Sequence, residues 1–365
     1  MRITKMARTS AVPVLGDPAI KHQRITQRRI AELAGVSQAT VSLVLNGKAD
    51  DAASRIPEET RRRVLEVIRE TTYVADPAAR RLAGGSNKIL GVFTYEPAFP
   101  SQSQDFYTPL LTGIEAQAES IGCDLLMFTS APVTDGRRRI FHENNRLRLA
   151  DGCLLLGLEM DDNELSRLAA SDFPFVAIGR RETPGVPYVG ADYAAGTADL
   201  VAQALEQGHD RFFLLARKSS GESVTDRRRG FHDALSNKPV SSETRITTGA
   251  DLQADWAAIK AFNPTVLFIE YPAHATALYA LALAEGLRVP EDLSMVVLGE
   301  CSAPSDPDID FTRLSPPRTA LGSTAVTLLA RIIASDEELP DSELRTLLDC
   351  PTIPGSTLTK ARRKP

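Results

Sequence analysis

Apolar residues recur at helical spacing twice within residues 26–46, with a short break between the two groups. The repeating positions are Ile30, Leu33, Ala34, Val41, Val44 and Leu45. In the break, Gly35 allows the left-handed backbone that a sharp turn requires, and Ser37 is a preferred capping residue for the start of a helix. Val36 stands between them, where it can fill the space between two helices. The pattern therefore predicts two short helices joined by a tight turn.

A third helix is predicted for residues 57–70, directly downstream. Pro57 suits the first turn of a helix, and Glu58 and Glu59 lie near the positive end of the helix dipole. The residues that we expect to face inward from this helix are Val64, Leu65 and Ile68.

Beyond residue 87 the pattern changes to short apolar runs that alternate with helical stretches. A first series of strands is expected at 89–93, 123–128, 152–156 and 175–178, with helices at 107–121 and 162–170. A second series is expected at 188–190, 212–216, 265–270 and 294–298, with a return near 312–314. Such alternation predicts an α/β region in which helices cover both faces of parallel sheets.

The composition is that of a soluble globular protein with two or three domains. The chain has 365 residues, of which 43% are hydrophobic and 24% charged. No apolar run is long enough for a transmembrane helix, and the N-terminal residues lack the apolar core of a secretory signal. The four cysteines lie far apart without metal-ligand spacing, so reduced thiols are expected. We therefore expect a cytoplasmic protein that does not associate with membranes and needs no metal.

The charges are segregated along the chain. Residues 1–87 contain 15 Lys and Arg against 9 Asp and Glu, whereas the remainder is acidic and the whole chain has a net charge of −5. A basic module attached to an acidic body is typical of nucleic-acid-binding proteins. A solvated charged surface would not require this segregation. Residues 1–25 show no periodicity and are expected to form a mostly disordered arm.

The second of the predicted helices begins with polar and small side chains. The amide of Gln38, the methyl of Ala39 and the hydroxyl of Thr40 can touch base edges and phosphates from a helix N-terminus. The alternative is an ordinary pair of packed helices, which the apolar pattern alone would allow. The short turn, the serine cap and the polar leading edge together favour a helix-turn-helix that binds DNA.

The order of these segments resembles that of the LacI/GalR family of bacterial transcription repressors, from about Thr26 to Thr359. The resemblance implies an all-α helix-turn-helix headpiece joined to a two-lobed α/β domain like that of periplasmic binding proteins, with parallel sheets flanked by helices. The expected divisions are a DNA-binding domain at 26–74, a hinge at 75–87, an effector-binding and dimerisation domain at 88–359, and a tail at 360–365.

By this resemblance, Gln38 and Ala39 are the positions that mainly decide which operator bases are read. Gln can pair with adenine through two hydrogen bonds, and the Ala methyl can contact a thymine methyl. Leu43 departs from relatives that carry a basic or polar residue there, so the operator sequence is not inferred. The other residues expected at the DNA surface are Thr26, Gln27, Ser37, Thr40, Ser42 and Asn46.

Residues 76–85 match the short hinge helix of the family. Small residues there would let two such helices pack closely, and a helix this short is marginal until it pairs and docks on DNA. Leu82 matches the leucine that wedges between base steps in the minor groove, with Arg80 and Arg81 beside it. The alternative is that Leu82 only packs at a dimer interface.

The resemblance also implies an effector site between the lobes, at the carboxyl ends of strands. Phe106 and Tyr107 match an aromatic pair that stacks on a ligand ring, and Arg227 matches an arginine that clamps ligand hydroxyls or carboxylates. Asp192 is the expected acidic contributor, with capping of the next helix as its alternative. The other three residues have ordinary alternatives as well, in an aromatic core or a surface ion pair.

Two departures from the family pattern affect the choice of effector. Tyr271-Pro272 stands where many relatives have Asn-Asp, and Gly299 replaces a further Asp. A conventional sugar effector is therefore less certain, and a regulator without an effector stays open. The residues that could rebuild a polar site for another small molecule are Glu270, Tyr271 and Glu300.

These observations predict a homodimeric transcriptional regulator, most simply a repressor, that binds a pseudo-palindromic operator under the control of a small molecule. The segment after Ser356 is too short for a tetramerising helix, so a dimer is expected. No phosphate-binding loop, metalloprotease motif or nucleophile elbow is present, which argues against an enzyme and against a cofactor. A solute-binding protein is the alternative, but it would have no use for residues 26–85.

Overall fold

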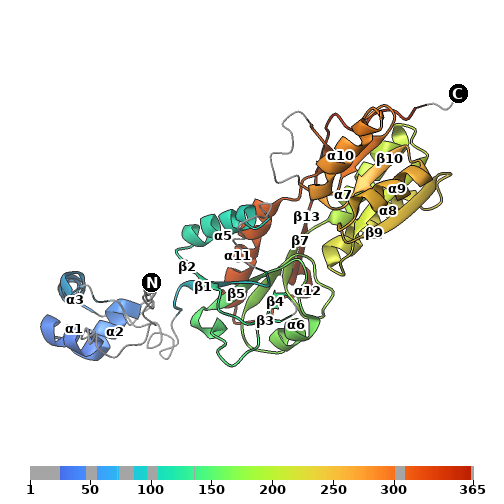
Figure 1. Cartoon of the computed structure of the whole chain (residues 1–365). Helices are drawn as coiled ribbons and strands as arrows, with labels where there is room; N and C mark the ends of the chain where they lie inside the picture. The colour runs from blue at the N-terminus through green and yellow to red at the C-terminus, as the bar shows by residue number, and fades with distance from the viewer. Residues whose placement is uncertain are drawn as a thin grey trace, which may run out of the picture. The chain divides into compact units, whose positions relative to one another are not determined.

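The computed structural model describes residues 25–46, 56–71, 73, 86–96, 106–134, 136–300 and 309–362. The chain divides into two compact units, residues 1–87 and residues 88–365 (Figure 1). Among the described helices, none is long and apolar enough to cross a membrane.

Within its described residues, the first unit contains three helices, which are α1 (Gln27–Ala34), α2 (Gln38–Asn46) and α3 (Glu58–Thr71). Their shared core consists of the buried side chains of Ile30, Ala31, Ala34, Val41 and Val64. Leu65 was expected to face inward, but it is 37% exposed. A step of one residue turns the side chain about 100° around a helix, so Leu65 leaves the stripe that Val64 occupies.

The second unit contains two six-stranded sheets. The first has the order β13-β7-β6-β5-β1-β2, and all its neighbouring strands are parallel. Its strands are β1 (Ile89–Thr94), β2 (Asp124–Phe128), β5 (Gly152–Leu156), β6 (Phe175–Ile178), β7 (Tyr188–Ala191) and β13 (Arg345–Leu348). With the helices that pack on it, this sheet forms lobe 1.

The second sheet has the order β14-β12-β11-β10-β8-β9 and is parallel except for β14, which runs antiparallel to β12. Its strands are β8 (Arg211–Arg217), β9 (Ser241–Thr247), β10 (Val266–Ile269), β11 (Ser294–Val297), β12 (Thr312–Leu314) and β14 (Thr352–Ile353). This sheet and its helices form lobe 2. A separate small hairpin pairs β3 (Val133–Thr134) with β4 (Arg137–Arg138).

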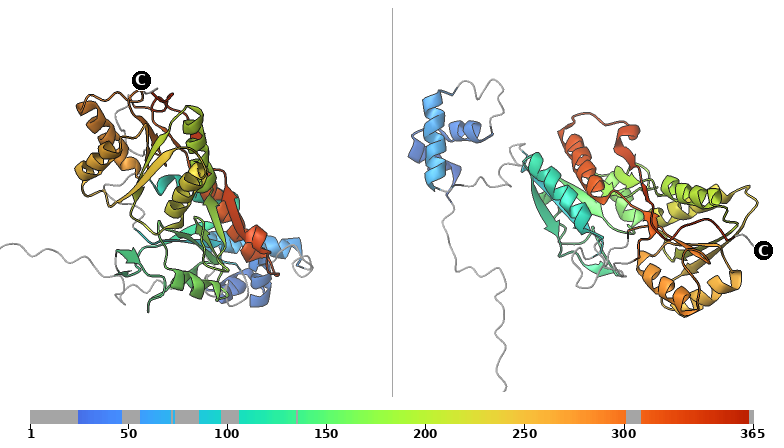
Figure 2. Two further views of the ribbon diagram at one scale, coloured as in Figure 1. Left: turned by 90° about the vertical axis from the view of Figure 1, so that its right-hand side faces the viewer. Right: turned by 90° about the horizontal axis from the view of Figure 1, so that it is seen from above.

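The helices flank the sheets, as βα alternation requires. In lobe 1, α5 (Thr108–Ser120) and α11 (Arg318–Ala334) lie side by side, and α11 also packs on β5, β6 and β7 (Figures 1 and 2). In lobe 2, α7 (Tyr193–Glu206) packs against α8 (Glu222–Leu235). The other helices of the described part of this unit are α6 (Asp162–Ala169), α9 (Leu252–Phe262), α10 (Ala275–Ala284), α12 (Asp341–Leu344) and the 3₁₀ turns Leu147–Leu149 and Pro272–His274.

One strand belongs to a different lobe from the one expected. Residues 188–190 were placed at the start of the second series, but β7 pairs with β6 and β13 in the sheet of lobe 1. The chain leaves lobe 1 only after β7, so the strand is the last of the first series. The position of a strand along the chain does not reveal this, because sheet membership depends on its partners.

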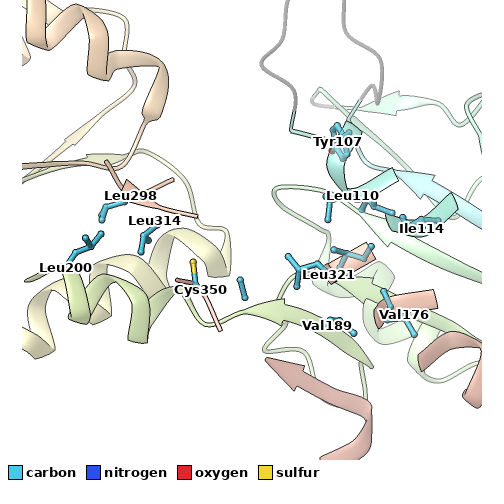
Figure 3. Close-up of a cluster of buried hydrophobic side chains, with 14 of the residues drawn as sticks. Tyr107, Leu110, Ile114, Val176, Val189, Leu200, Leu298, Leu314, Leu321 and Cys350 are labelled. Atoms are coloured by element: carbon cyan, nitrogen blue, oxygen red, sulfur yellow. The ribbon is translucent and has the colours of Figure 1, made fainter. Parts of the chain in front are cut away.

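In the described part of the chain, three segments connect the lobes: between β7 and α7, between β12 and α11, and between β13 and β14. Backbone hydrogen bonds tie the crossings together: the Asp192 amide donates to Leu348 O at the end of β13 (2.8 Å), and the Ser315 amide donates to Pro351 O in the third crossing (2.8 Å). Cys350 lies in the third crossing and is buried in the apolar cluster drawn in Figure 3.

Candidate functional site

The turn between α1 and α2 is closed by local hydrogen bonds. Gly35 adopts a left-handed conformation (φ 64°, ψ 40°) at the end of α1, and the Val36 amide donates to Ala31 O at 3.0 Å. The Ser37 hydroxyl oxygen accepts from the Thr40 amide at 3.1 Å, which caps the start of α2. Gly35 thus forms the turn and Ser37 caps the next helix, as the sequence predicts.

The start of α2 presents an exposed, uncharged edge. Ser37, Gln38 and Ala39 are exposed, whereas Val41 behind them is buried in the headpiece core. Because the free amide groups of a helix N-terminus attract phosphate, this edge can approach a DNA backbone while its side chains reach base edges.

The other residues expected at the DNA surface surround this edge. Thr26 is exposed and its hydroxyl oxygen accepts from the Arg29 amide (3.4 Å), which caps α1. Gln27, Thr40 and Ser42 are half-buried. Asn46 is the last residue of α2. The two hinge residues Arg80 and Leu82 lie outside the described residues.

A cavity of about 520 Å³ lies between the lobes of the second unit. Six of the seven expected effector residues line it, and they come from both lobes: Phe106, Tyr107, Arg227, Glu270, Tyr271 and Glu300. Glu270 directly follows β10, and Glu300 lies three residues after β11. Carboxyl ends of neighbouring parallel strands meet at one edge of a sheet, which brings these residues together.

Asp192 does not line the cavity. Its Oδ1 accepts from the Ala195 amide at 2.9 Å and caps α7, which is the alternative role considered for it. The next residue, Tyr193, lines the cavity instead.

Tyr107 is fixed by a carboxylate at the wall of the cavity. Its hydroxyl donates to Glu96 Oε2 at 2.5 Å. Burial, together with the charge of Glu96, raises the pKa of Tyr107, so the phenol stays protonated and able to donate at neutral pH. The ring of Phe106 meets that of Tyr107 edge-on at 5.1 Å, and the Arg318 guanidinium lies 5.0 Å from the Phe106 ring centre.

Both acidic residues that follow the lobe 2 strands have partners in the protein. Glu270 is 4% exposed, and its Oε2 accepts from the Arg217 amide at 2.7 Å. Burial raises the pKa of Glu270, against the opposing attraction of Arg227 and other nearby donors. Glu300 accepts from the Ser315 hydroxyl and from Arg313 Nε, the latter at 3.2 Å.

Two arginines contact aromatic rings in the cavity. The Arg227 guanidinium lies 3.8 Å from the centre of the Tyr193 ring, and its Nη1 donates to Ser223 O on the same helix at 2.9 Å. The Arg217 guanidinium lies 5.1 Å from the centre of the Tyr271 ring. Such stacking orients a guanidinium while leaving its edge able to donate hydrogen bonds.

Ion pairs connect the two lobes beside the cavity. Arg180, after β6 in lobe 1, donates to both carboxylate oxygens of Asp226 on α8, at 2.6 and 2.8 Å. Arg181 donates to Glu222 on the same helix at 2.6 Å. We call these two pairs the interlobe clamp. Glu159 of lobe 1 also accepts from the Ser219 hydroxyl and the Ser220 amide.

Comparison with known proteins gives two family matches. Residues 27–76 match the model for bacterial regulatory proteins of the lacI family, and residues 201–357 match that for a periplasmic binding protein-like domain. The transcriptional regulator CelR of Thermobifida fusca is 26% identical over 336 residues, which cover 88% of this chain and 95% of CelR. The chain belongs to the LacI family. The repressor PurR of Photobacterium profundum is 24% identical, covering 83% and 90% of the two chains.

Solved structures of LacI-family proteins share the fold. The lac repressor dimer bound to operator and the anti-inducer ONPF has a TM-score of 0.70 at 20% identity, covering 92% of this chain and 100% of that chain. The CelR–cellobiose complex has a TM-score of 0.60 at 24% identity, covering 91% and 99%. The predicted fold class, a helical headpiece with a two-lobed α/β domain, is thereby confirmed.

The family also decides between the predicted functions. The LacI-family chain is a DNA-binding transcriptional regulator, and its relatives are regulators and not enzymes. A solute-binding protein without DNA function is excluded by the match of residues 27–76 to the regulatory headpiece.

Sequence reasoning missed several residues that line the cavity of this LacI-family chain. They are Glu96, Arg180, Arg181, Tyr193, Arg217 and Arg318. A signal was available for three of them, because Arg180 and Arg181 closely follow β6 and Arg217 ends β8. A charged residue at the carboxyl end of a parallel strand is a candidate ligand contact. The pairing of Arg180 and Arg181 with α8 depends on tertiary structure and has no local signal.

Proposed function

We propose that this protein is a repressor that binds a pseudo-palindromic operator as a homodimer. Its affinity for the operator falls or rises when a small molecule binds between the lobes. The observation that carries the proposal is the exposed start of α2, with Gln38 and Ala39 in front of a buried core, in a headpiece of the matching family. The cavity between the two lobes supports the second part of the proposal, which is control by a small molecule. The protein would act in the cytoplasm, on chromosomal DNA.

On the operator, α2 lies in the major groove. Gln38 pairs with an adenine edge and Ala39 contacts a thymine methyl, whereas Ser37, Thr40 and Ser42 contact phosphates. Thr26 and Gln27 at the start of α1 and Asn46 at the end of α2 add backbone contacts. A hinge at 75–87 carries Leu82 and Arg80 into the minor groove and bends the centre of the site.

Dimerisation and effector control are supported by the structures of relatives. One solved lac repressor is a dimer bound to operator, and CelR has been solved with cellobiose. In the present protein a ligand in the cavity would contact both lobes at once, so it would favour one lobe arrangement over the other. The fraction of the protein able to bind DNA would shift accordingly. A sugar or related metabolite is the starting hypothesis for the effector.

The proposal is tested by selecting genomic fragments with the full-length protein at moderate salt. Full-length protein should enrich a discrete set of fragments, and a chain that starts at residue 88 should enrich none. Gln38→Ala should reduce the preference for the selected site over random duplex by about tenfold, because one two-bond base contact is worth about 1–3 kcal/mol.

The matched control is Glu70→Gln, an exposed residue at the end of α3. This variant should select the same fragments as the unchanged protein. Equal retention of selected and random duplex by the full-length protein, with and without metabolites, would refute the proposal.

A further inference from the structure

Three of the four carboxylates that line the cavity, Glu96, Asp226 and Glu300, already have cationic or hydroxyl partners. Asp226 is held by Arg180 and by Arg229, which donates to it at 3.0 Å. Glu300 accepts from Arg313 and Ser315, and Glu96 accepts from Tyr107. Their oxygens are therefore poorly placed to grip the hydroxyl groups of a neutral sugar.

The arginines at the lobe 2 end of the cavity are in the opposite situation. Arg217 and Arg227 both line the cavity, and within the described residues neither forms an ion pair with a carboxylate. Arg217 contacts the ring of Tyr271, and Arg227 contacts the ring of Tyr193 and donates through Nη1 to Ser223 O, which leaves other guanidinium N–H groups for a ligand.

A single carboxylate lies among three guanidinium groups at this end. Glu270 is 3.7 Å from Arg228 Nε, and both Arg227 and Arg217 lower its pKa against the effect of burial. One carboxylate cannot neutralise three guanidinium groups, so the cluster keeps a net positive charge. An anion from outside would complete it.

A smaller pocket of about 190 Å³ adjoins the main cavity at Arg217. It shares Arg217 and Tyr271 with the main cavity and adds Lys218, Thr247 and His274. The positive region therefore extends beyond the main cavity, on the side of the loop after β8. The two spaces together suit a ring-sized body with a charged substituent.

We propose that the effector is an anionic small molecule, whose carboxylate or phosphate group is held between Arg217 and Arg227. The body of the molecule packs against the rings of Phe106 and Tyr193, which line the same cavity. Arginine is suited to this role because its planar donors match the oxygens of both groups. This inference rests on the proposed function, because it assumes that the cavity is the effector site.

The test measures binding to the full-length protein without DNA, by calorimetry and by thermal unfolding at constant ionic strength. The probes are inorganic phosphate, glucuronate and glucose 6-phosphate, with glucose as the neutral counterpart. At least one anion should bind saturably and more tightly than glucose. Glucuronate and glucose 6-phosphate separate the carboxylate from the phosphate.

Two variants assign the binding to the proposed residues. Arg217→Met and Arg227→Met should each weaken anion binding by about tenfold, as expected for loss of a charge-assisted contact. Arg217→Lys keeps the positive charge and should bind the anion more tightly than Arg217→Met. This comparison separates loss of the anion contact from loss of the fold. The matched control is Arg148→Met, an exposed arginine of lobe 1 outside the cavity, which should bind like the unchanged protein.

Three outcomes would overturn the inference: glucose binding as tightly as the anions, no saturable anion binding at millimolar concentration, or equal loss in Arg148→Met. A neutral ligand would leave the proposed effector control intact while refuting its anionic class. Failure to select any operator would instead refute the proposed function and leave these binding measurements unaffected.

Discussion

Single residues in the cavity combine charge with burial, and Glu270 is the clearest example. Its side chain is almost completely buried, so the charged form loses solvation that the surrounding arginines only partly replace. The pKa of Glu270 is raised as a result. The folded protein therefore binds a proton at this residue more readily than the unfolded chain does.

This linkage gives a pH prediction for Glu270→Gln. Above the ordinary Glu pKa of 4.5, the unchanged protein should lose unfolding free energy as the pH rises toward the raised value, because the folded state holds the extra proton. A glutamine at this position cannot titrate but can still accept from the Arg217 amide, so the variant should lack this loss. Urea unfolding at about pH 5 and about pH 7 measures the difference.

The control for this experiment is Glu338→Gln, an exposed carboxylate of lobe 1. Its unfolding free energy should follow the unchanged protein at both pH values. A Glu270→Gln variant whose pH dependence is also unchanged would contradict the raised pKa.

At the scale of helices and strands, the sequence predicted the elements better than their partners. The runs at 152–156 and 175–178 are buried on both faces and were predicted with the bounds that the structure shows. The edge strand β9, Ser241–Thr247, is mostly polar and exposed, so no apolar run marked it. Asp192 lies after a strand, as a ligand contact would, but local hydrogen bonding makes it a cap.

The contact between α5 and α11 depends on two glycines far apart in the sequence. A Cβ at Gly113 would overlap Thr319 O, and a Cβ at Gly322 would overlap Leu110 O. The backbones of the two helices can approach this closely only because both positions lack a side chain. Neither glycine is distinguishable in the sequence from one that merely weakens a helix.

Gly113→Ala should therefore destabilise lobe 1, although alanine is the better helix former. Overpacking against a backbone atom costs about 1–3 kcal/mol, which exceeds the helix-propensity gain of about 1 kcal/mol. Thermal unfolding of the chain from residue 88 measures the change. Thr112→Ala, at the exposed neighbouring position, should have little effect. A more stable Gly113→Ala variant would show that the helices can separate without cost.

Across the whole second unit, the interlobe clamp joins lobe 1 to helix α8 of lobe 2. Arg180 and Asp226 are both largely buried, with side chains 15% and 4% exposed. The clamp partner Asp226 lies on α8 one residue before Arg227, so the clamp and the proposed ligand site share one helix. A ligand that moves α8 would act directly on the clamp.

Removing one partner of the clamp should cost more than removing both. Asp226→Asn leaves the buried Arg180 with only the exposed Glu182 as an acidic partner, and the expected loss of unfolding free energy is about 3 kcal/mol. The double variant Arg180→Met with Asp226→Leu should lose less, because no buried charge is left without a partner. Urea denaturation measures both. Equal losses in the single and double variants would contradict the expected cost of a buried guanidinium without its carboxylate.

The third crossing between the lobes contains a chemical reporter of their movement. Cys350 is buried there beside Gly196, and burial raises the pKa of its thiol to about 11. At neutral pH the thiol therefore stays almost entirely protonated, so alkylating reagents should modify it very slowly. Any twisting of the crossing that admits water would accelerate the reaction, and the modification rate of this cysteine would then time the movement of the lobes in the unlabelled, native protein.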